Sequence, residues 1–145
     1  MTNKDIASLF HEMANLMELH GENVFKTRTY ANAYLNIRKL DIPLGDKSLQ
    51  ELKSMVGIAS SIADKIIEIH SKNTFEALEK KKKKTPAGIR EILNIKGLGP
   101  KKVKQLWHEL NIESPGELQY ACQENRLIQL KGFGSKIQAD ILNSL

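Results

Sequence analysis

The segment Lys96-Gly97-Leu98-Gly99-Pro100 decides the fold, because the chain repeats its pattern twice more. The other copies are Val56-Gly57-Ile58-Ala59-Ser60 and Lys131-Gly132-Phe133-Gly134-Ser135. Each copy follows an apolar residue and precedes a stretch with helical periodicity, so each predicts a turn between two helices. The copies begin 40 and 35 residues apart, which is the spacing of a repeated supersecondary unit. In chain order we call them the first, second and third hairpins.

Glycine gives such a turn two properties. It adopts backbone angles that other residues avoid, and it lets another backbone approach closely. The helix that follows offers unpaired N–H groups and the positive end of its dipole, which suit a phosphate oxygen. This is the arrangement of a helix-hairpin-helix, and it predicts contact with a nucleic-acid backbone without reading of the bases. The alternative is three ordinary turns in which glycine merely ends a helix.

The candidate DNA-binding residues belong to the three turns and to the lysines beside them. We expect two phosphates to be held by the main-chain N–H groups of the second and third hairpins, with lysines adding charge. The full set is Gly57, Ile58, Ala59, Gly97, Leu98, Gly99, Lys101, Lys102, Lys104, Lys131, Gly132, Phe133, Gly134, Ser135 and Lys136.

Composition limits the remaining possibilities. A chain of 145 residues with 41% apolar residues fits one globular domain or two small ones. No long apolar run predicts a transmembrane helix, and the N-terminus lacks the apolar stretch of a secretion signal. Cys122 is the only cysteine, so it forms no internal disulfide and is expected to be buried in a protein of a reducing compartment, the cytoplasm.

Positive charge is concentrated in the second half of the chain. Residues 1–79 carry 9 Lys/Arg and 11 Asp/Glu, whereas residues 80–145 carry 13 Lys/Arg and 6 Asp/Glu. The half with the second and third hairpins therefore carries a charge of +7, and a polyanion is expected to bind there first.

Helical signals dominate and strand signals are absent, so we predict an all-α protein of two small subdomains built around helix-hairpin-helix motifs. The first covers residues 1–79 and the second residues 86–145, with the basic segment 80–85 as a linker, because five adjacent lysines weaken a helix. The linker is either solvated or a loose phosphate contact. Helices are expected over 24–39, with Phe25 inward, from Thr74, and from Pro86 to Leu93.

Four stretches of the chain resemble the N-terminal region of the family X DNA polymerases, in particular the bacterial members related to DNA polymerase beta. Phe25 to Ala33 is similar to the second helix of the family's small lyase-type domain, and Met55 to Ile66 to the hairpin of that domain. Ile95 to Leu118 resembles the hairpin of the duplex-binding fingers subdomain, and Leu130 to Ile141 the third hairpin of the bacterial members.

The resemblance implies a bacterial, cytoplasmic and nucleoid-associated protein, a monomer that holds gapped or nicked DNA for a repair polymerase. The family's polymerase chemistry needs an Asp-x-Asp pair in a palm subdomain, and no Asp-x-Asp occurs here. We therefore expect either part of a larger polymerase or a stand-alone relative, and Mg²⁺ would act only with a palm.

The resemblance also implies a hypothesis of catalysis, the removal of a 5′-deoxyribose phosphate by β-elimination. The Schiff-base lysine of the family falls on Lys65, and its 5′-phosphate pocket falls on Lys26, Tyr30 and Lys53. The sequence departs from the family pattern at three positions of this domain: Phe25 replaces a histidine, Ser61 a lysine and Ala59 a glycine. Otherwise Lys65 is a solvated lysine paired with Glu68.

In the family, hairpin carbonyls also coordinate a monovalent cation that bridges to phosphate. By motif position, a Na⁺ or K⁺ ion would be held by the carbonyls of Leu93, Ile95 and Leu98, and another by those of Lys53, Met55 and Ile58. A third functional hypothesis is a helical module that binds other proteins, which the lysines around the second and third hairpins disfavour.

Overall fold

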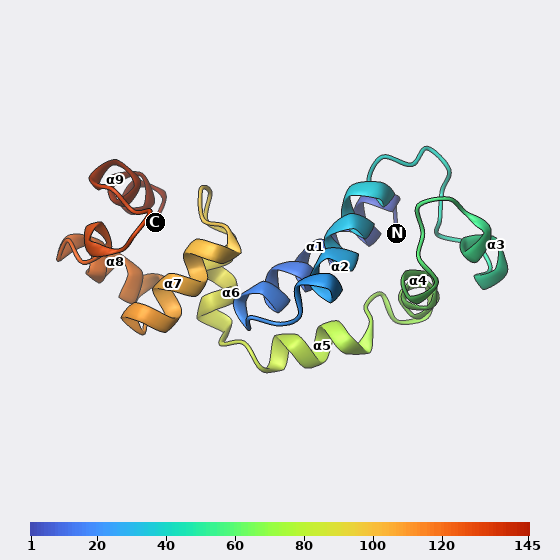
Figure 1. The fold of residues 1–145 in the computed structure, drawn as a ribbon, viewed down its shortest axis with the longest axis horizontal. Helices are drawn as coiled ribbons and strands as arrows, with labels where there is room; N and C mark the ends of the chain where they lie inside the picture. The colour runs from blue at the N-terminus through green and yellow to red at the C-terminus, as the bar shows by residue number, and fades with distance from the viewer. The chain divides into compact units, whose positions relative to one another are not determined.

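The computed structural model describes all 145 residues, and these form helices joined by turns, with no strand (Figure 1). This confirms the predicted all-helical class. The elements are α1 (Asn3–Leu19), α2 (Val24–Ile37), α3 (Leu49–Ser54), α4 (Ser60–Lys72), α5 (Glu76–Lys83), α6 (Ala87–Leu93), α7 (Pro100–Leu110), α8 (Pro115–Gln123), the short 3₁₀ helix η1 (Leu127–Gln129) and α9 (Ser135–Ser144). None of these helices is long and apolar enough to span a bilayer.

The chain divides into two compact units, Met1–Lys81 and Lys82–Leu145. The division falls inside the segment 80–85 in which the sequence placed a boundary. The first unit carries 11 Lys/Arg and 11 Asp/Glu, and the second carries 11 Lys/Arg and 6 Asp/Glu. All of the net charge of +5 therefore lies in the second unit, which contains the second and third hairpins.

The lysine run is helical, and the expectation of a linker over residues 80–85 was wrong in this respect. α5 continues through Lys83. The helix is stabilised because Leu78 is fully buried and Lys80 pairs with Glu76 one turn earlier at 3.0 Å. Lys81 also forms an ion pair with Glu22 in the α1–α2 loop. Tertiary contacts thus outweigh the repulsion between adjacent lysines.

The core of the first unit forms where α1 and α2 pack along each other and α4 and α5 close over them. The rings of Phe10, Tyr30 and Phe75 contact one another, with the centroid of Phe10 6.1 Å from Tyr30 and 5.4 Å from Phe75, and those of Tyr30 and Phe75 6.1 Å apart. Such aromatic clusters bury a large apolar area. The other large side chains that are fully buried here are Ile6, Leu16, Leu19, Ile37, Leu44, Leu52, Ile62, Ile66, Ile69 and Leu78.

Helix α2 begins at Val24 as expected but differs from the sequence expectation in its end and in the burial of Phe25. It ends at Ile37, and the side chain of Phe25, which was expected inside, is 77% exposed. Asn23 caps the first turn through the N–H groups of Phe25 and Lys26, and the face of α2 that carries Phe25 continues with the polar residue Thr29. Periodicity placed Phe25 on a helix correctly, but no other element covers that face.

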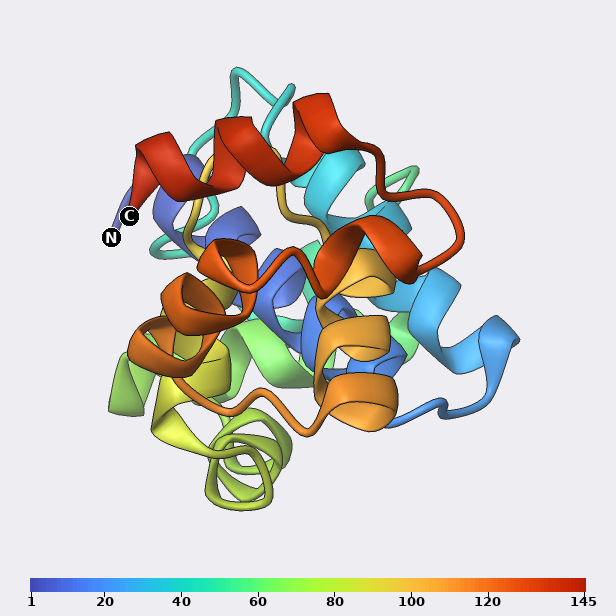
Figure 2. The same cartoon turned by 90° about the vertical axis from the view of Figure 1, so that its left-hand side faces the viewer.

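The second unit packs α6 to α9 around its own apolar core (Figure 2, yellow to red). Gly88 of α6 is essential to this packing, because a Cβ there would lie 2.0 Å from the carbonyl oxygen of Glu113. η1, not an α-helix, precedes the third hairpin. Cys122 is buried as expected, and burial raises the pKa of its thiol. The other buried apolar residues are Ile89, Ile92, Leu98, Val103, Leu106, Ile112, Leu118, Ala121, Leu127, Phe133 and Ile141.

Two expected helix starts are shifted. α5 begins at Glu76, two residues after Thr74, and its first N–H group donates to the carboxylate of Glu68 at 2.9 Å. α6 begins at Ala87, so that Pro86 stands at the N-cap position and not in the first turn. In both cases the change is one or two residues at an element boundary, where local signals are weakest.

Candidate nucleic-acid interface

The three hairpin turns share one backbone geometry. The first glycine of each turn is left-handed, with φ of +90° at Gly57, +88° at Gly97 and +85° at Gly132. Residues with a side chain rarely adopt left-handed backbone angles, which explains the glycine at this position of every copy. One main-chain hydrogen bond closes each turn, from Ile58 N–H to Met55, Leu98 N–H to Ile95, and Phe133 N–H to Leu130, at 3.4, 3.1 and 3.1 Å.

The apolar residue after this glycine anchors each turn in the core. Ile58, Leu98 and Phe133 are buried, as the sequence predicted. Each anchor fixes the turn against its own unit, so the start of the next helix is held in a defined direction. The site is therefore built on a rigid scaffold and not on a free loop.

The helices after the three hairpins begin without a side-chain cap. Their N-cap residues are Ala59, Gly99 and Gly134, which are extended and offer no side-chain acceptor. Side chains cap four other helices, through Thr2, Asn23, Ser48 and Ser114. The first-turn N–H groups of α4, α7 and α9 thus remain available to an anion, which the positive end of the dipole also favours.

The second glycine of the second and third hairpins has no role within the chain. Gly99 has φ −94° and Gly134 φ −115°, angles that any residue adopts. A Cβ built on either glycine would meet nothing within 4 Å. The missing side chain therefore leaves space only for a group from outside the protein, which can approach the bare backbone. Ala59 occupies this position in the first hairpin.

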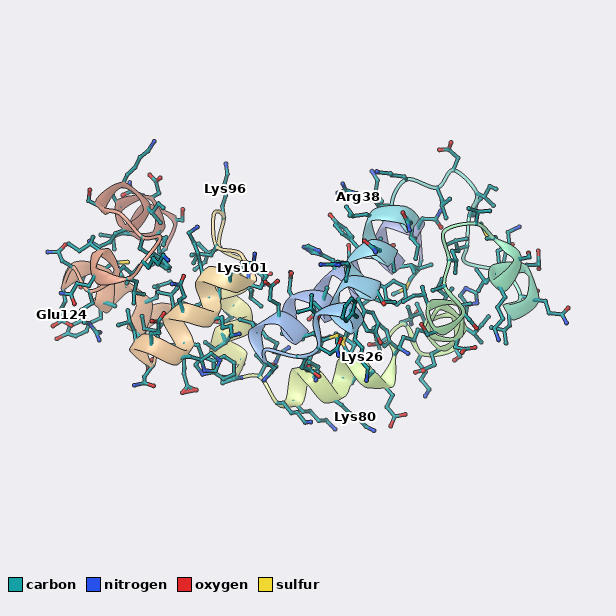
Figure 3. All side chains as sticks on the ribbon, viewed as in Figure 1. Lys26, Arg38, Lys80, Lys96, Lys101 and Glu124 are labelled. Atoms are coloured by element: carbon teal, nitrogen blue, oxygen red, sulfur yellow. The ribbon has the colours of Figure 1, made fainter.

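Free lysines surround the second and third hairpins. Lys101, Lys104, Lys131 and Lys136 are exposed, Lys102 is half-buried, and none of them forms an ion pair. Lys96 extends from the tip of the second turn (Figure 3). Lys96 was not among the residues predicted to bind, although its position in the repeat, which matches that of Lys131, was a sufficient signal.

The second and third hairpins are also linked directly. The side-chain amide of Gln105 in α7 donates to the main-chain carbonyl of Lys131 at 3.0 Å. α9 in turn is tied to the end of α8 by a hydrogen bond from Gln138 to Asn125, 2.9 Å long. The two turns of this unit therefore form one connected surface.

The residues expected to form a lyase site come together only in part. The Lys65 ammonium lies over the ring of Tyr30, 5.8 Å from its centroid. Lys26 is exposed on the first turn of α2 (Figure 3), and Lys53 pairs with Asp64 at 3.8 Å. The expected pairing of Lys65 with Glu68 is replaced, because Lys65 lies on Tyr30 and the Glu68 carboxylate accepts the first N–H group of α5.

The carbonyl groups expected to bind a cation lie at the ends of α3 and α6 and in the two turns that follow. Those of Met55 and Ile95 each accept one turn hydrogen bond. A carbonyl oxygen has two lone pairs, so each can still bind an ion, and hard oxygen ligands suit Na⁺ or K⁺. No three side chains of His, Cys, Asp or Glu gather into a metal site.

Comparison with known proteins agrees with this geometry. Residues 1–75 match the family described as a helix-hairpin-helix domain, and residues 89–145 match the SAM-like helix-hairpin-helix tandem. The whole chain is 32% identical to the DNA polymerase/3'-5' exonuclease PolX of Bacillus subtilis (strain 168), and it spans 25% of the length of that relative. The chain therefore belongs to the helix-hairpin-helix domain family, and it is a homologue of part of a bacterial family X DNA polymerase.

Proposed function

We propose that the chain binds DNA through the sugar–phosphate backbone, without reading base sequence, as the DNA-holding part of a family X repair polymerase. The observation that carries this proposal is the repeated bare helix start in the second unit. At Gly99 and Gly134 an uncapped N-terminus lies behind a glycine whose missing side chain leaves open space. Main-chain N–H groups there can donate to a phosphate oxygen.

The unpaired lysines supply the long-range part of the interaction. Each lysine that neutralises a phosphate releases a condensed counterion, so binding weakens as salt concentration rises. The second unit carries all of the net positive charge, and Lys101, Lys102, Lys104, Lys131 and Lys136 beside its hairpins form no ion pair. Backbone binding of this kind is indifferent to base sequence, because phosphates carry no sequence information.

The proposed target is gapped or nicked DNA. A gap or nick offers two duplex arms and a strand end, and the chain has two compact units that each carry at least one hairpin. Na⁺ or K⁺ would be held by the carbonyls of Leu93, Ile95 and Leu98, and by those of Lys53, Met55 and Ile58. Such an ion would supply a positive charge for a phosphate at each turn.

The test is a titration of labelled duplexes of unrelated sequence at several salt concentrations. With about four to six phosphates contacted, log K falls with log salt at a slope of roughly −4 to −5. Lys101→Gln with Lys136→Gln reduces the magnitude of the slope by about two. Lys47→Gln is the matched control, because Lys47 pairs with Glu51. A strong preference for one sequence at fixed salt would contradict the proposal.

A second candidate function, the 5′-deoxyribose phosphate lyase, rests on the contact between Lys65 and Tyr30. A Schiff-base lysine attacks as the neutral amine, with loss of water from the sugar aldehyde. Lys65 is half-buried and its side-chain nitrogen lies 5.8 Å from the centroid of the Tyr30 ring, so two of the residues expected at this site lie together. The pairing of Lys53 with Asp64 opposes this function, since it occupies one of the expected phosphate ligands.

A further inference from the structure

A pocket of about 540 Å³ lies in the first unit, where the start of α1 meets the segment that follows α2. Its volume falls within the range typical of ligand sites. Three of the residues that line it, Lys4, Arg38 and Lys39, are exposed cations, and none of them forms an ion pair. Asp41 is the one carboxylate in the lining, so three cations and one anion leave a charge of +2. We call this site the basic pocket.

Hydrogen bonds hold the two walls of the basic pocket together. The side-chain amide of Asn3 donates to the carbonyls of Leu40 and Ile42 at 3.2 and 2.8 Å, and its oxygen accepts the N–H of Leu44 at 2.9 Å. Leu44 is fully buried, which anchors the segment after α2 in the core. The pocket is therefore formed before a ligand binds, and binding costs little ordering of the main chain.

The guanidinium of Arg38 is held in position at the basic pocket. Its Nη1 donates to the hydroxyl of Tyr34 at 2.9 Å, and the guanidinium lies over the Tyr34 ring, 4.8 Å from the centroid. Tyr34 packs in turn on His11 of α1, with ring centroids 4.2 Å apart. Because a guanidinium has five N–H donors, Arg38 can still bind a carboxylate with the donors that Tyr34 does not use.

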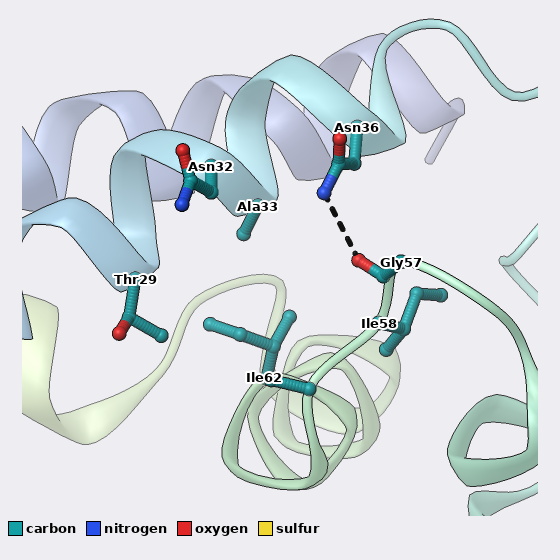
Figure 4. A pocket seen from close by; sticks show the side chains of 8 residues that line it. Thr29, Asn32, Ala33, Asn36, Gly57, Ile58 and Ile62 are labelled. Carbon is teal, nitrogen blue, oxygen red and sulfur yellow. Dashed lines mark hydrogen bonds between the residues drawn. The ribbon is translucent and has the colours of Figure 1, made fainter.

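Arg38 and the first hairpin lie on opposite sides of α2. Asn36 faces that hairpin, where its side-chain amide donates to the carbonyl of Gly57 (Figure 4). Arg38, at the end of α2 (Figure 3), follows two residues later, which is a rotation of about 200° around the helix axis. A ligand of the basic pocket therefore leaves the first hairpin free.

Apolar side chains beside the cations favour a protein segment over a nucleic acid. Ile42 is 52% exposed, and Leu40 and Pro43 line the pocket itself. Phosphate groups offer no apolar surface that could cover these side chains. A peptide carries acidic and apolar side chains next to each other, so it can pair with the cations and remove apolar area from water at the same time.

We propose that the basic pocket binds an acidic segment of a partner protein, one that also carries an apolar residue. One carboxylate of the segment meets the guanidinium of Arg38, further carboxylates meet Lys4 and Lys39, and the apolar residue covers Ile42. Since the hairpins remain free, a partner bound here can be held on the chain while the chain holds DNA. The inference goes beyond the proposed function and does not depend on DNA binding.

The test is an NMR titration of the isotopically labelled full chain with the peptide acetyl-Glu-Asp-Leu-Asp-Glu-Phe-amide. Exposed ion pairs are individually weak, so we expect a Kd of about 0.1–1 mM that rises with salt concentration. The amide signals that shift should be those of residues 3–4 and 38–43. A second peptide, in which Gln and Asn replace the acidic residues, should bind at least about fivefold more weakly.

Substitutions assign the binding to the basic pocket. Arg38→Gln with Lys39→Gln should weaken binding of the acidic peptide about threefold to tenfold, because two exposed ion pairs are lost. Ile42→Ser should weaken it about threefold, because the apolar contact is lost. Arg28→Gln with Lys72→Gln is the matched control, since it removes the same charge from exposed positions outside the pocket, and it should leave the affinity unchanged. All five side chains are exposed, so thermal melting should show that each variant folds.

Three results would overturn the inference. They are the absence of shifts with the acidic peptide, equal affinity for the two peptides, and wild-type affinity in Arg38→Gln with Lys39→Gln. A single-stranded oligonucleotide that displaces the peptide and shifts the same amide signals at lower concentration would also overturn it, by assigning the pocket to DNA. The duplex titrations that test the proposed function are separate measurements, so either idea can fail without the other.

Discussion

Gln105, in the helix that follows the second hairpin, holds the third hairpin in place. Its side-chain amide donates to the main-chain carbonyl of Lys131 at 3.0 Å. In the first hairpin Asn36 forms a similar bond one position further along the turn, to the carbonyl of Gly57, at 3.2 Å. In both cases an amide from a neighbouring helix fixes the carbonyl of a turn. In the second unit this bond sets the spacing between two turns that we propose to contact phosphates, so it links the stability of the fold to DNA binding.

Gln105→Ala is expected to weaken duplex binding about threefold or more, because the third hairpin loses its fixed position relative to the second. The free energy of unfolding should fall by about 0.5–1 kcal/mol, the net value of one partly exposed hydrogen bond. Fluorescence anisotropy and urea denaturation measure the two effects. Gln119→Ala, at an exposed position of α8, is the control and should change neither. An unaltered duplex affinity in Gln105→Ala would show that the two turns act independently.

Acid should remove the contribution that the N-terminal cap of α1 makes to the free energy of unfolding. The N–H of Thr2 donates to Asp5 at 2.9 Å, and this bond holds the pKa of the Asp5 carboxyl below its usual range. Since the pKa is lowered in the folded state, the stabilisation is present above the unfolded-state pKa of about 4 and is lost as pH falls through the folded-state pKa. Urea midpoints of wild type and Asp5→Asn should differ at pH 7, and the difference should shrink as pH falls below about 4. A difference that persists at pH 2 would contradict this assignment.

Borohydride trapping decides whether Lys65 is a Schiff-base lysine or only packs on the ring of Tyr30. If the lyase hypothesis holds, reduction in the presence of an oligonucleotide with a 5′-deoxyribose phosphate gives a covalent adduct, and Lys65→Ala abolishes it. Lys72→Ala, an exposed lysine at the end of the same helix, should leave the adduct intact. No adduct with the wild type would mean that Lys65 serves only to cover the Tyr30 ring.

The repeat predicted the essential parts of the site. The left-handed Gly97, the buried Leu98 and the bare start at Gly99 follow from residue types and their order, because each property is local. The same reasoning held for the first and third hairpins, with Gly57 and Gly132 left-handed as well. Local chemistry is therefore enough to specify this motif.

What the sequence did not predict depends on tertiary contacts. Periodicity showed that Phe25 lies on a helix, but it did not show that this face of α2 remains uncovered. Repulsion among the lysines argued for a linker, yet the Lys81–Glu22 pair and the burial of Leu78 keep α5 helical. The basic pocket combines side chains at the start of α1 with those at the end of α2, and no local pattern relates them.

The most direct test of backbone binding is the double variant Gly99→Val with Gly134→Val. Both glycines have ordinary backbone angles and open space around them, so added side chains should cost the fold less than about 1 kcal/mol. Ala59→Val, at the same position of the first hairpin, is the matched control. With thermal melting to verify folding, we predict that the double variant binds plain duplex about tenfold or more weakly, while the control changes little. A folded double variant with wild-type duplex affinity would contradict the account.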